Sequence, residues 1–210
     1  DIPVIMISSD ASEDVIRKSY ELGASDYVNR PFDARIVYRR VTNTIKLYTK
    51  QRRLVKMVSN QIKKQQHDTA MLVGVLSQIV EFRNGESGIH VLHIQTITEM
   101  LLRQLVQKEN NRYALSKEQI RMITTASALH DIGKISIPDE ILNKPGRLTA
   151  EEFAVIKGHS MAGANMLDQL PIEQREEPLV KTAYEICRWH HERYDGKGYP
   201  DGLKGEEIPI

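Results

Sequence analysis

Cysteine is nearly absent from this chain. Cys187 is the only one among 210 residues, so no disulfide can form within the chain. The sequence also lacks an apolar run near the roughly 18 residues that a membrane-spanning helix needs. Its first residues lack the charged and apolar regions of a secretory signal peptide. Together these absences predict a protein of the reducing cytoplasm with no membrane span.

Acidic side chains are missing from residues 34–67, which carry ten lysines and arginines. A basic helix of this kind can bind nucleic acid or an anionic membrane. However, neither a nucleic-acid motif nor interleaved aromatic residues accompany these charges. We therefore interpret the segment as a solvated helix face and expect no nucleic-acid partner.

Proline is also absent between Ala34 and Arg83, where Gly74 is the only glycine. This predicts one long helix that continues from the first region into the next. Two heptad series run along it, and they indicate a seam that is polar in its middle and apolar at its end. The seam predicts either a parallel homodimer through this linker helix or a single helix packed within its own chain. The series are Val41, Tyr48, Val55, Ile62, Thr69 and Leu76, and Thr44, Gln51, Val58, Gln65, Leu72 and Ile79.

The first 40 residues have the alternation of a doubly wound α/β sheet. Residues 3–8 are a continuous apolar run, typical of a strand buried on both faces of a parallel sheet. A helix follows from about Asp10 to Gly23, then a short strand at residues 26–29 and another helix start near Asp33. Two strands do not make a stable parallel sheet. Partner strands upstream are therefore implied.

The remainder is mainly helical in pattern. Ser116 and Thr149 each open a capping box, the signature of a helix N-terminus. The expected helices cover residues 90–107, 116–130, 149–170 and 177–191. Residues 194–210 are rich in glycine and proline, which predicts an ordered loop.

Histidines and carboxylates that suit metal ions recur in this helical region. His130-Asp131 and His190-His191 are vicinal pairs, whose side chains on a helix point about 100° apart. Such a pair can serve two adjacent metals, or one metal where the helix ends. Imidazole and carboxylate ligands suit Zn, Fe, Mn or Ni. After His130-Asp131, Gly133 allows close backbone approach and Lys134 offers a cation for a phosphate.

Further ligand-type residues surround these pairs. Glu86 and His90 are four residues apart and face the same way on one helical turn. A lone His159 would more often be a core histidine. Spacing alone does not establish a site, because no tight zinc-type spacing is present. Seven residues together would suit a dinuclear site with room for a third ion: Glu86, His90, His130, Asp131, His159, His190 and His191.

The order of the motifs resembles the HD-GYP phosphodiesterases over residues 65–210. The matching segments are Glu81-x-Arg83, Glu86 to His90, His130 to Lys134, Ile137 to Asp139, Lys144 to Gly146, His159, His190 to Arg193, Asp195 to Pro200, Leu203-x-Gly205 and Ile208-Pro209. The resemblance implies a helical HD-domain fold. It implies hydrolysis of cyclic di-GMP to the linear dinucleotide pGpG, and onward to GMP. It also implies two or three divalent transition-metal ions (Fe, Mn, Ni or Zn).

The resemblance also implies roles for individual residues. Asp131 and the five histidines match metal ligands, with Asp131 bridging two ions and Glu86 as an extra carboxylate. Lys134 matches the lysine that contacts the substrate phosphate, so Asp131 and Lys134 are the expected catalytic residues. Tyr199 lies in the loop that lines the dinucleotide cleft, and this loop is expected to meet partner proteins such as diguanylate cyclases. The histidines are His90, His130, His159, His190 and His191.

Departures from the family pattern are few. Asn84 stands where Asp is usual, and Ser160 follows His159 where Pro is common. The family continues past Ile208-Pro209 into a helix that carries another metal-ligating Asp, and the 210 residues end before it. The predicted domain therefore lacks its C-terminal helices.

The first region is similar to the last part of a response-regulator receiver domain, a flavodoxin-like α/β fold. Ser8 matches its switch hydroxyl and Tyr27 its switch aromatic. Arg30 precedes Pro31 where Lys is usual, which keeps the charge but not the compact ammonium group. The similarity implies control by phosphorylation from an upstream histidine kinase.

The sequence thus predicts three parts: residues 1–40 as a partial receiver, 41–68 as a linker helix, and 69–210 as the HD-GYP domain. The expected activity is a cyclic-guanylate-specific phosphodiesterase in two-component signalling. The alternative is a catalytically inactive module that senses cyclic di-GMP or metal. A phosphohydrolase acting on mononucleotides is disfavoured by the loop at residues 195–200.

Overall fold

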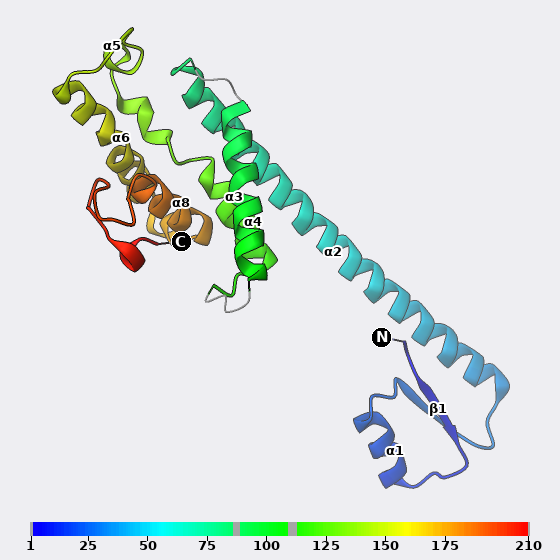
Figure 1. Ribbon diagram of the computed structural model, residues 1–210. Coiled ribbons are helices and arrows are strands. Elements are labelled where there is room, and N and C mark those ends of the chain that lie inside the picture. Colours follow the sequence, from blue (N-terminus) through cyan, green and yellow to red (C-terminus); the bar gives the residue numbers. More distant parts are fainter. Residues whose placement is uncertain (1, 86–88, 109–112, 210) are drawn as a thin grey trace. The chain divides into compact units, whose positions relative to one another are not determined.

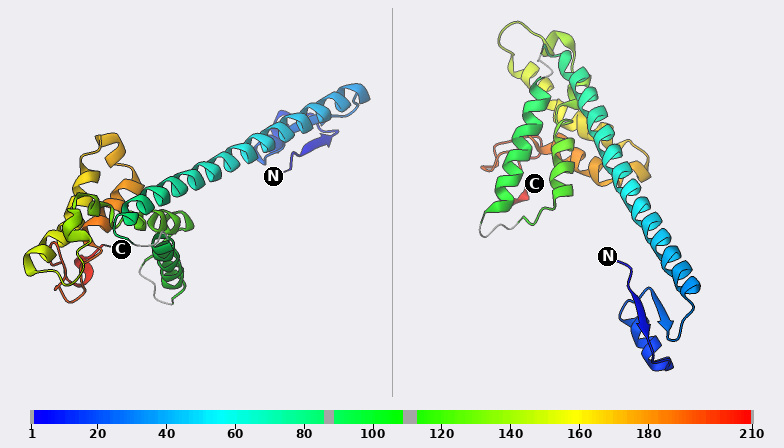
Figure 2. Two further views of the ribbon diagram at one scale, coloured as in Figure 1. Left: turned by 90° about the horizontal axis from the view of Figure 1, so that it is seen from above. Right: turned by 90° about the vertical axis from the view of Figure 1, so that its right-hand side faces the viewer.

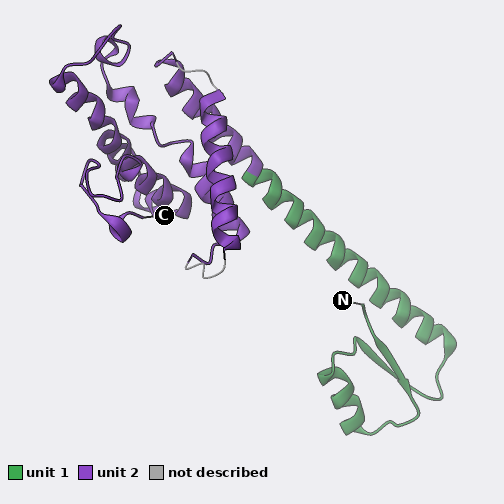
Figure 3. Ribbon diagram, viewed as in Figure 1, with its two compact units in different colours: residues 1–66 green, residues 67–210 purple. Residues whose placement is uncertain are grey.

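The computed structural model describes residues 2–85, 89–108 and 113–209. Helices dominate these residues, and strand structure is confined to a short parallel pair and one isolated bridge. The predicted mainly α class is therefore confirmed. The chain divides into two compact units, residues 1–66 and 67–210 (Figure 3). Among the described residues, we find no helix whose length and apolar character would let it cross a bilayer.

The first unit begins with β1 (Ile5–Ser8), α1 (Glu13–Glu21) and β2 (Asp26–Asn29) (Figure 1). The strands pair in parallel, as expected of a βαβ unit, with Ile5 opposite Asp26. Gly23 ends the segment after α1 with φ of 92°, a conformation that glycine adopts without strain.

One expectation for this sheet is wrong in the described chain. The run at residues 3–8 predicted a strand buried on both faces, but Met6 and Ile7 are 42% and 43% exposed. The sheet of the described residues has two strands. The faces of a parallel strand are covered by helices packed on the sheet, and helix α1 contacts β2.

The long helix α2 (Ala34–Phe82) is confirmed at 49 residues. Its first turns belong to the first unit, and its residues from His67 onward belong to the second. The apolar seam side chains are largely exposed: Val55 is 64% exposed, Val58 58% and Ile62 50%. A homodimer along this seam stays a prediction.

The second unit adds the helices α3 (Ile89–Gln107), α4 (Lys117–Ser127), α6 (Ala150–Asp168) and α8 (Pro178–Trp189). Shorter elements connect them: the 3-10 helices η1 (Ile132–Ser136) and η2 (Gly205–Glu207), and the single turns α5 (Asp139–Leu142) and α7 (Ile172–Arg175). Both predicted capping boxes are confirmed, at Ser116 and Thr149. The sequence did not predict the four short elements.

Packing in the second unit centres on α8. Helix α4 contacts α3 and α8, while α6 contacts α8 and η1 (Figure 2). Small side chains line these contacts, and Ala126, Ala164 and Ala183 are fully buried. A Cβ atom added at Gly133 would lie 1.9 Å from the carbonyl oxygen of His159. The glycine therefore lets η1 approach the α6 backbone.

Helix α4 ends at Ser127 rather than at the predicted His130. The backbone N–H groups of Leu129 and His130 donate to carbonyls three residues earlier, at 2.9 and 3.3 Å. This tighter turn replaces the last α-helical turn. His130 and Asp131 consequently lie beyond the end of the α-helix, where His130 Nε2 lies 3.1 Å from Asp131 Oδ2.

Candidate metal centre

A buried group of three histidines and one aspartate lies where several elements meet. One ligand atom from each of Asp131, His159, His190 and His191 lies within 4.8 Å of all the others. Asp131 precedes η1, His159 lies in the middle of α6, and the vicinal histidines follow the end of α8. Three separate elements therefore converge on one point. This geometry brings together most of the ligand-type residues that the sequence singled out.

Asp131 is at the centre of this group. Its Oδ2 atom lies 3.1 Å from His130 Nε2, and its Oδ1 atom lies 3.1 Å from His159 Nε2. His190 Nε2 lies 3.6 Å from the same Oδ1 and 3.1 Å from His159 Nε2. Oδ1 thus faces two imidazole nitrogens, and Oδ2 faces one imidazole nitrogen together with the Lys134 ammonium group.

The opposite ring nitrogens fix the orientation of these imidazoles. Nδ1 of His130, His159 and His190 lies 3.0, 2.6 and 3.0 Å from a backbone carbonyl oxygen three or four residues earlier. A carbonyl oxygen only accepts, so Nδ1 carries a proton and Nε2 is the ring nitrogen that faces the centre. Nitrogens that face one another and a carboxylate need positive charge between them, which either protons on Nε2 or a bound metal ion can supply. Metal-binding histidines in proteins have this outer hydrogen bond, so the residues fit a divalent metal ion.

Electrostatics favour positive charge at the centre. Burial alone would raise the pKa of Asp131, but hydrogen bonds from His130, His159 and His190 outweigh burial and lower it. Burial alone would lower the pKa of His130, but the hydrogen bond and the charge of Asp131 raise it. The carboxylate therefore stays ionised and attracts cations.

His191 differs from its neighbour. Burial, with the nearby His190 and His159, lowers the pKa of His191 to about 4. Its imidazole is therefore neutral at physiological pH, the protonation state that a metal ligand needs.

A second group adjoins the first through His130. Glu81, His90 and His130 each offer one ligand atom, and these atoms lie within 4.8 Å of one another. Glu81 is 1% exposed, and its Oε1 atom lies 3.9 Å from His90 Nε2. The sequence assigned the carboxylate beside His90 to Glu86, which lies outside the described residues. It named Glu81 only within the motif Glu81-x-Arg83 and gave it no ligand role, because no sequence pattern shows that Glu81 lies beside His90.

Lys134 is close to the aspartate. Its ammonium nitrogen lies 2.7 Å from Asp131 Oδ2, and its side chain is only 16% exposed. The sequence assigned Lys134 to a substrate phosphate. The structure places its charge on the carboxylate at the centre, so a phosphate that enters would share this lysine with Asp131.

Arg83 connects the end of α2 with the η1 turn. Its guanidinium donates to the carbonyl oxygens of Ile135 and Ile137, at 2.7 and 3.2 Å, and to Asp139 Oδ1 at 2.6 Å. In return, Asn143 donates to the Arg83 carbonyl at 2.9 Å. These bonds hold the turn that carries Lys134. The sequence named Arg83 within a motif without predicting this contact.

Tyr199 covers one side of the centre. Its ring stacks on His191, with ring centroids 4.6 Å apart and an interplanar angle of 22°. Lys157 Nζ lies 5.7 Å from the centroid of the same tyrosine ring. Burial and the charge of Asp131 raise the pKa of Tyr199. The tyrosine predicted to line a substrate cleft therefore also contacts a ligand-type histidine.

The loop around Tyr199 is fixed to the end of α8. Asp201 accepts from Arg188 at 2.7 and 3.0 Å and from the Trp189 indole at 2.7 Å. Glu192 Oε1 accepts from the Asp201 backbone N–H at 2.7 Å. A Cβ atom at Gly198 would lie 2.5 Å from Glu192 Cα, so only glycine fits there. The predicted ordered loop is confirmed, and these contacts give it its order.

The three predicted switch residues lie in the first unit. Ser8 Oγ accepts from the Asp10 backbone N–H at 3.1 Å, and the Tyr27 hydroxyl donates to the Asp10 carbonyl at 2.6 Å. The Arg30 backbone N–H donates to the Ser8 carbonyl at 2.8 Å. Ser8 and Arg30 therefore lie at the carboxyl ends of the two strands, and the Tyr27 hydroxyl reaches the segment that follows β1.

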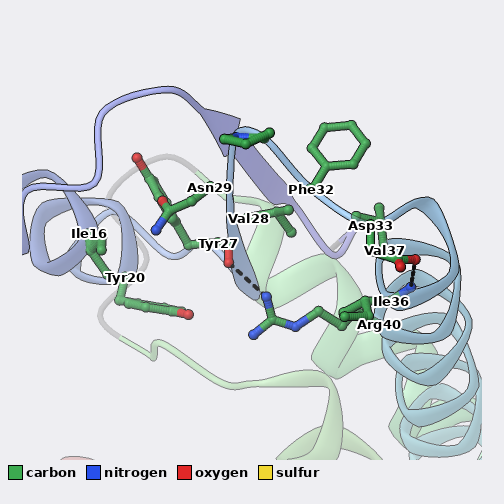
Figure 4. Close-up of a pocket in the computed structure, with 11 residues that line it drawn as sticks. Ile16, Tyr20, Tyr27, Val28, Asn29, Phe32, Asp33, Ile36, Val37 and Arg40 are labelled. Atoms are coloured by element: carbon green, nitrogen blue, oxygen red, sulfur yellow. Dashed lines mark hydrogen bonds between the residues drawn. The ribbon is translucent and has the colours of Figure 1, made fainter.

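A hollow of about 380 Å³ lies beside β2 in the same unit (Figure 4). Its lining is mostly apolar, and Arg40 reaches across it to donate to the Tyr27 carbonyl at 3.1 Å. Arg40 also lies 3.4 Å from Asp26. With its cation engaged in this way, the hollow offers a packing surface rather than a reactive centre.

Comparison with known proteins places this geometry in context. The HD domain family model matches residues 35–210. A probable cyclic di-GMP phosphodiesterase of Vibrio cholerae is 33% identical over 100% of this chain and 49% of its own length. The cyclic di-GMP phosphodiesterase response regulator RpfG of Xanthomonas campestris is 32% identical over 100% of this chain and 54% of its own length.

A third relative has a different named substrate. The 3′3′-cGAMP-specific phosphodiesterase 2 of Vibrio cholerae is 40% identical over 66% of this chain and 24% of its own length. The chain spans about half the length of the first two relatives.

Proposed function

Because this chain belongs to the HD domain family, we propose that it is a metal-dependent phosphodiesterase that hydrolyses cyclic di-GMP to pGpG, and onward to GMP. One observation carries the proposal: the Nε2 atoms of His130, His159 and His190 converge on the buried carboxylate of Asp131. The names of two relatives that align with the whole chain support the choice of substrate.

The proposed centre holds two or three divalent ions of Fe, Mn, Ni or Zn. Asp131 would bridge two of them, with the histidines as the other ligands. When bound, such ions supply a hydrolytic nucleophile at neutral pH and neutralise charge on a phosphodiester. The donor set of imidazole and carboxylate suits these metals.

The protein's own groups would orient the phosphodiester. Lys134, held beside Asp131, would neutralise a non-bridging phosphate oxygen. Tyr199 would line the dinucleotide cleft. In the proposed reaction water adds to phosphorus, the bond to the ribose 3′ oxygen breaks, and that oxygen leaves with a proton. Cys187 does not compete as a nucleophile, because burial raises the pKa of its thiol to about 12 and the thiol donates to the Leu129 carbonyl at 3.1 Å.

We assign residues 1–40 to part of a receiver domain, 41–68 to a linker helix and 69–210 to the HD-GYP domain, in a cytoplasmic protein. An upstream histidine kinase would act through the receiver. Exposed seam residues on α2 support a homodimer, and the Tyr199 loop is the proposed docking point for diguanylate cyclases. RpfG, named as a response regulator, offers the precedent for the receiver.

Two other functions are distinguished by one experiment. The cGAMP-specific relative supports 3′3′-cGAMP as a second candidate substrate, and a sensor would bind without turnover. The full chain loaded with Mn²⁺ is given either cyclic dinucleotide, and products are separated by liquid chromatography. We expect pGpG from cyclic di-GMP. Release of product from 3′3′-cGAMP alone favours the second substrate.

Lys134→Ala separates enzyme from sensor. In an enzyme this variant keeps its metal and loses about tenfold to a thousandfold in turnover, as for removal of one electrostatic stabiliser. Lys181→Ala, whose lysine pairs with the exposed Glu176, serves as the control. Binding of metal and cyclic di-GMP by the unmodified chain with no product would establish the sensor.

A further inference from the structure

We infer that Glu81 is a metal ligand, and that it completes a site of two histidines and one carboxylate with His90 and His130. The inference rests on the metal centre of the proposed function and adds a residue to it. The resemblance to HD-GYP proteins assigns the carboxylate next to His90 to Glu86 instead. Glu81 and Glu86 therefore make competing predictions.

Burial is the first support. Glu81 is 1% exposed, and a carboxylate is rarely this buried unless it is paired or coordinates a metal. It lies on the last turn of α2 among residues of the same buried face, Ser77 and Val80. The carboxylate of Glu81 is thus held in the interior beside His90 and His130.

Geometry is the second support. Glu81 Oε1 lies 3.9 Å from His90 Nε2, which is too long for a hydrogen bond but fits two ligands of one ion about 2 Å from each. One ligand atom of His130 completes the set within 4.8 Å. The three residues come from α2, α3 and the turn after α4. Two histidines and a carboxylate with open positions are the donor set preferred by non-haem Fe(II).

The surroundings supply the third support. The His90 and His130 ring centroids are 6.0 Å apart, and His130 and His190 are 5.3 Å apart. His130 therefore lies between this site and the Asp131 group. An ion bound by Glu81 would sit next to the Asp131 group and share its electrostatic field.

The test compares Glu81→Gln and Glu86→Gln in the full chain. Each protein is stripped with a chelator, dialysed against Mn²⁺ and washed, and its metal is counted by elemental analysis and electron paramagnetic resonance. Gln keeps the size of the side chain and removes the charged ligand. Glu99→Gln, on the exposed face of α3 where Glu99 pairs with Arg103, is the control for loss of a carboxylate.

We expect Glu81→Gln to hold one Mn²⁺ fewer per chain than the unmodified protein, while Glu99→Gln holds the full number. Loss of an ion in Glu86→Gln as well would leave Glu81 a ligand and add a second carboxylate. A full complement of Mn²⁺ in Glu81→Gln would overturn the inference, whether or not Glu86→Gln loses an ion.

Folding is checked by thermal denaturation of the metal-free proteins. If Glu81→Gln does not fold, Glu81→Asp decides, because it keeps the charge and shortens its reach. A ligand role predicts at least tenfold weaker binding of one Mn²⁺ in Glu81→Asp, and unchanged affinity for every ion overturns the role. Absence of hydrolysis in the unmodified protein would count against the proposed enzyme and leave these metal counts unaffected.

Discussion

The two units of this chain differ in what they bury. Both expose large apolar side chains, such as Met6 and Leu22 in residues 1–66 and Phe82 in residues 67–210. The described residues of the first unit bury Ser19, Tyr27 and Val28, and none of these carries a charge. In residues 67–210, polar and charged side chains are buried, as Glu81, Asp131 and His159 are. Buried charges point to cations that the protein must provide or bind.

The difference teaches where the chemistry of this chain lies. An apolar side chain at the surface loses only its share of burial energy, about 25 cal/mol per Å² of apolar area. A buried carboxylate loses its hydration and needs direct compensation. The second unit buries two such carboxylates, those of Glu81 and Asp131.

Removing the central carboxylate should have the largest effect. Asp131→Ala takes away the acceptor shared by His130, His159 and Lys134. We expect loss of bound metal and at least a thousandfold loss of cyclic di-GMP hydrolysis, from the combined loss of ions and charge stabilisation. Asp26→Ala in the first unit, which removes a partner of Arg40, should keep its metal. If the two variants held the same amount of metal, Asp131 would not be needed for metal binding.

A single methyl group should disrupt the backbone contact beneath the centre. In Gly133→Ala the new Cβ would lie 1.9 Å from the His159 carbonyl oxygen and 2.5 Å from the Gly163 nitrogen. Both are backbone atoms and cannot move aside cheaply, so we expect a loss of about 3 kcal/mol in the free energy of unfolding. Denaturation by urea measures it.

Gly74→Ala is the matched control for this substitution. Gly74 lies inside α2, and a Cβ atom there meets nothing within 4 Å. Alanine is the better helix former, so this variant should gain roughly 0.5–1 kcal/mol. A Gly133→Ala protein as stable as the unmodified chain would show that η1 and α6 are not held as closely as described.

Arg83→Ala should loosen the turn that carries Lys134. It leaves the carbonyls of Ile135 and Ile137 without their guanidinium donor. We expect a loss of about 2 kcal/mol in the free energy of unfolding, because charged hydrogen bonds and unsatisfied acceptors each contribute. Arg103→Ala removes an exposed pair with Glu99 and should cost less than about 0.5 kcal/mol. Equal losses in the two variants would show that the hydrogen bonds from Arg83 do not stabilise the η1 turn.

The smallest effect concerns the pH dependence of the metal-free protein. The pKa of His191 falls from 6.5 to about 4 on folding. Between these values the unfolded chain takes up a proton that the folded chain does not, so the free energy of unfolding falls as pH falls through this window. The histidine is half-buried, so its share is about 1 kcal/mol after allowance for solvent screening.

His191→Gln should flatten the pH dependence between pH 6.5 and 4. Thermal denaturation at several pH values in a chelating buffer would show it. His67→Gln on α2 is a suitable control, because this histidine is outside both metal groups. If the stability of the His191→Gln protein changed with pH as much as that of the unmodified protein, the burial of His191 would not contribute to the pH dependence of folding.

Short sequence patterns predicted much of the fold. The capping boxes at Ser116 and Thr149 are short patterns that act within one helical turn, and both formed as expected. The absence of proline and near-absence of glycine predicted α2 correctly. The single-turn helices α5 and α7 escaped prediction because four residues are too few to show helical periodicity.

The site was only partly accessible from the sequence. The resemblance to HD-GYP proteins singled out His130, Asp131 and His159, which the structure brings together. The roles of Glu81 and Arg83 depend on long-range approach: Arg83 bonds to a carbonyl 52 residues away. No local pattern encodes such a distance. The exposure of β1 likewise depends on which other elements pack on its faces, and the apolar sequence of β1 does not identify them.

The dependence of hydrolysis on bound metal is tested most directly by returning metal stepwise to the stripped protein. The full chain is treated with chelator and titrated with Mn²⁺ while bound metal and release of pGpG from cyclic di-GMP are followed together. We predict no hydrolysis in the stripped protein and recovery only as a second ion binds per chain, since Asp131 faces histidines with both oxygens. Undiminished hydrolysis by protein with less than about one-tenth of an ion per chain would contradict the account.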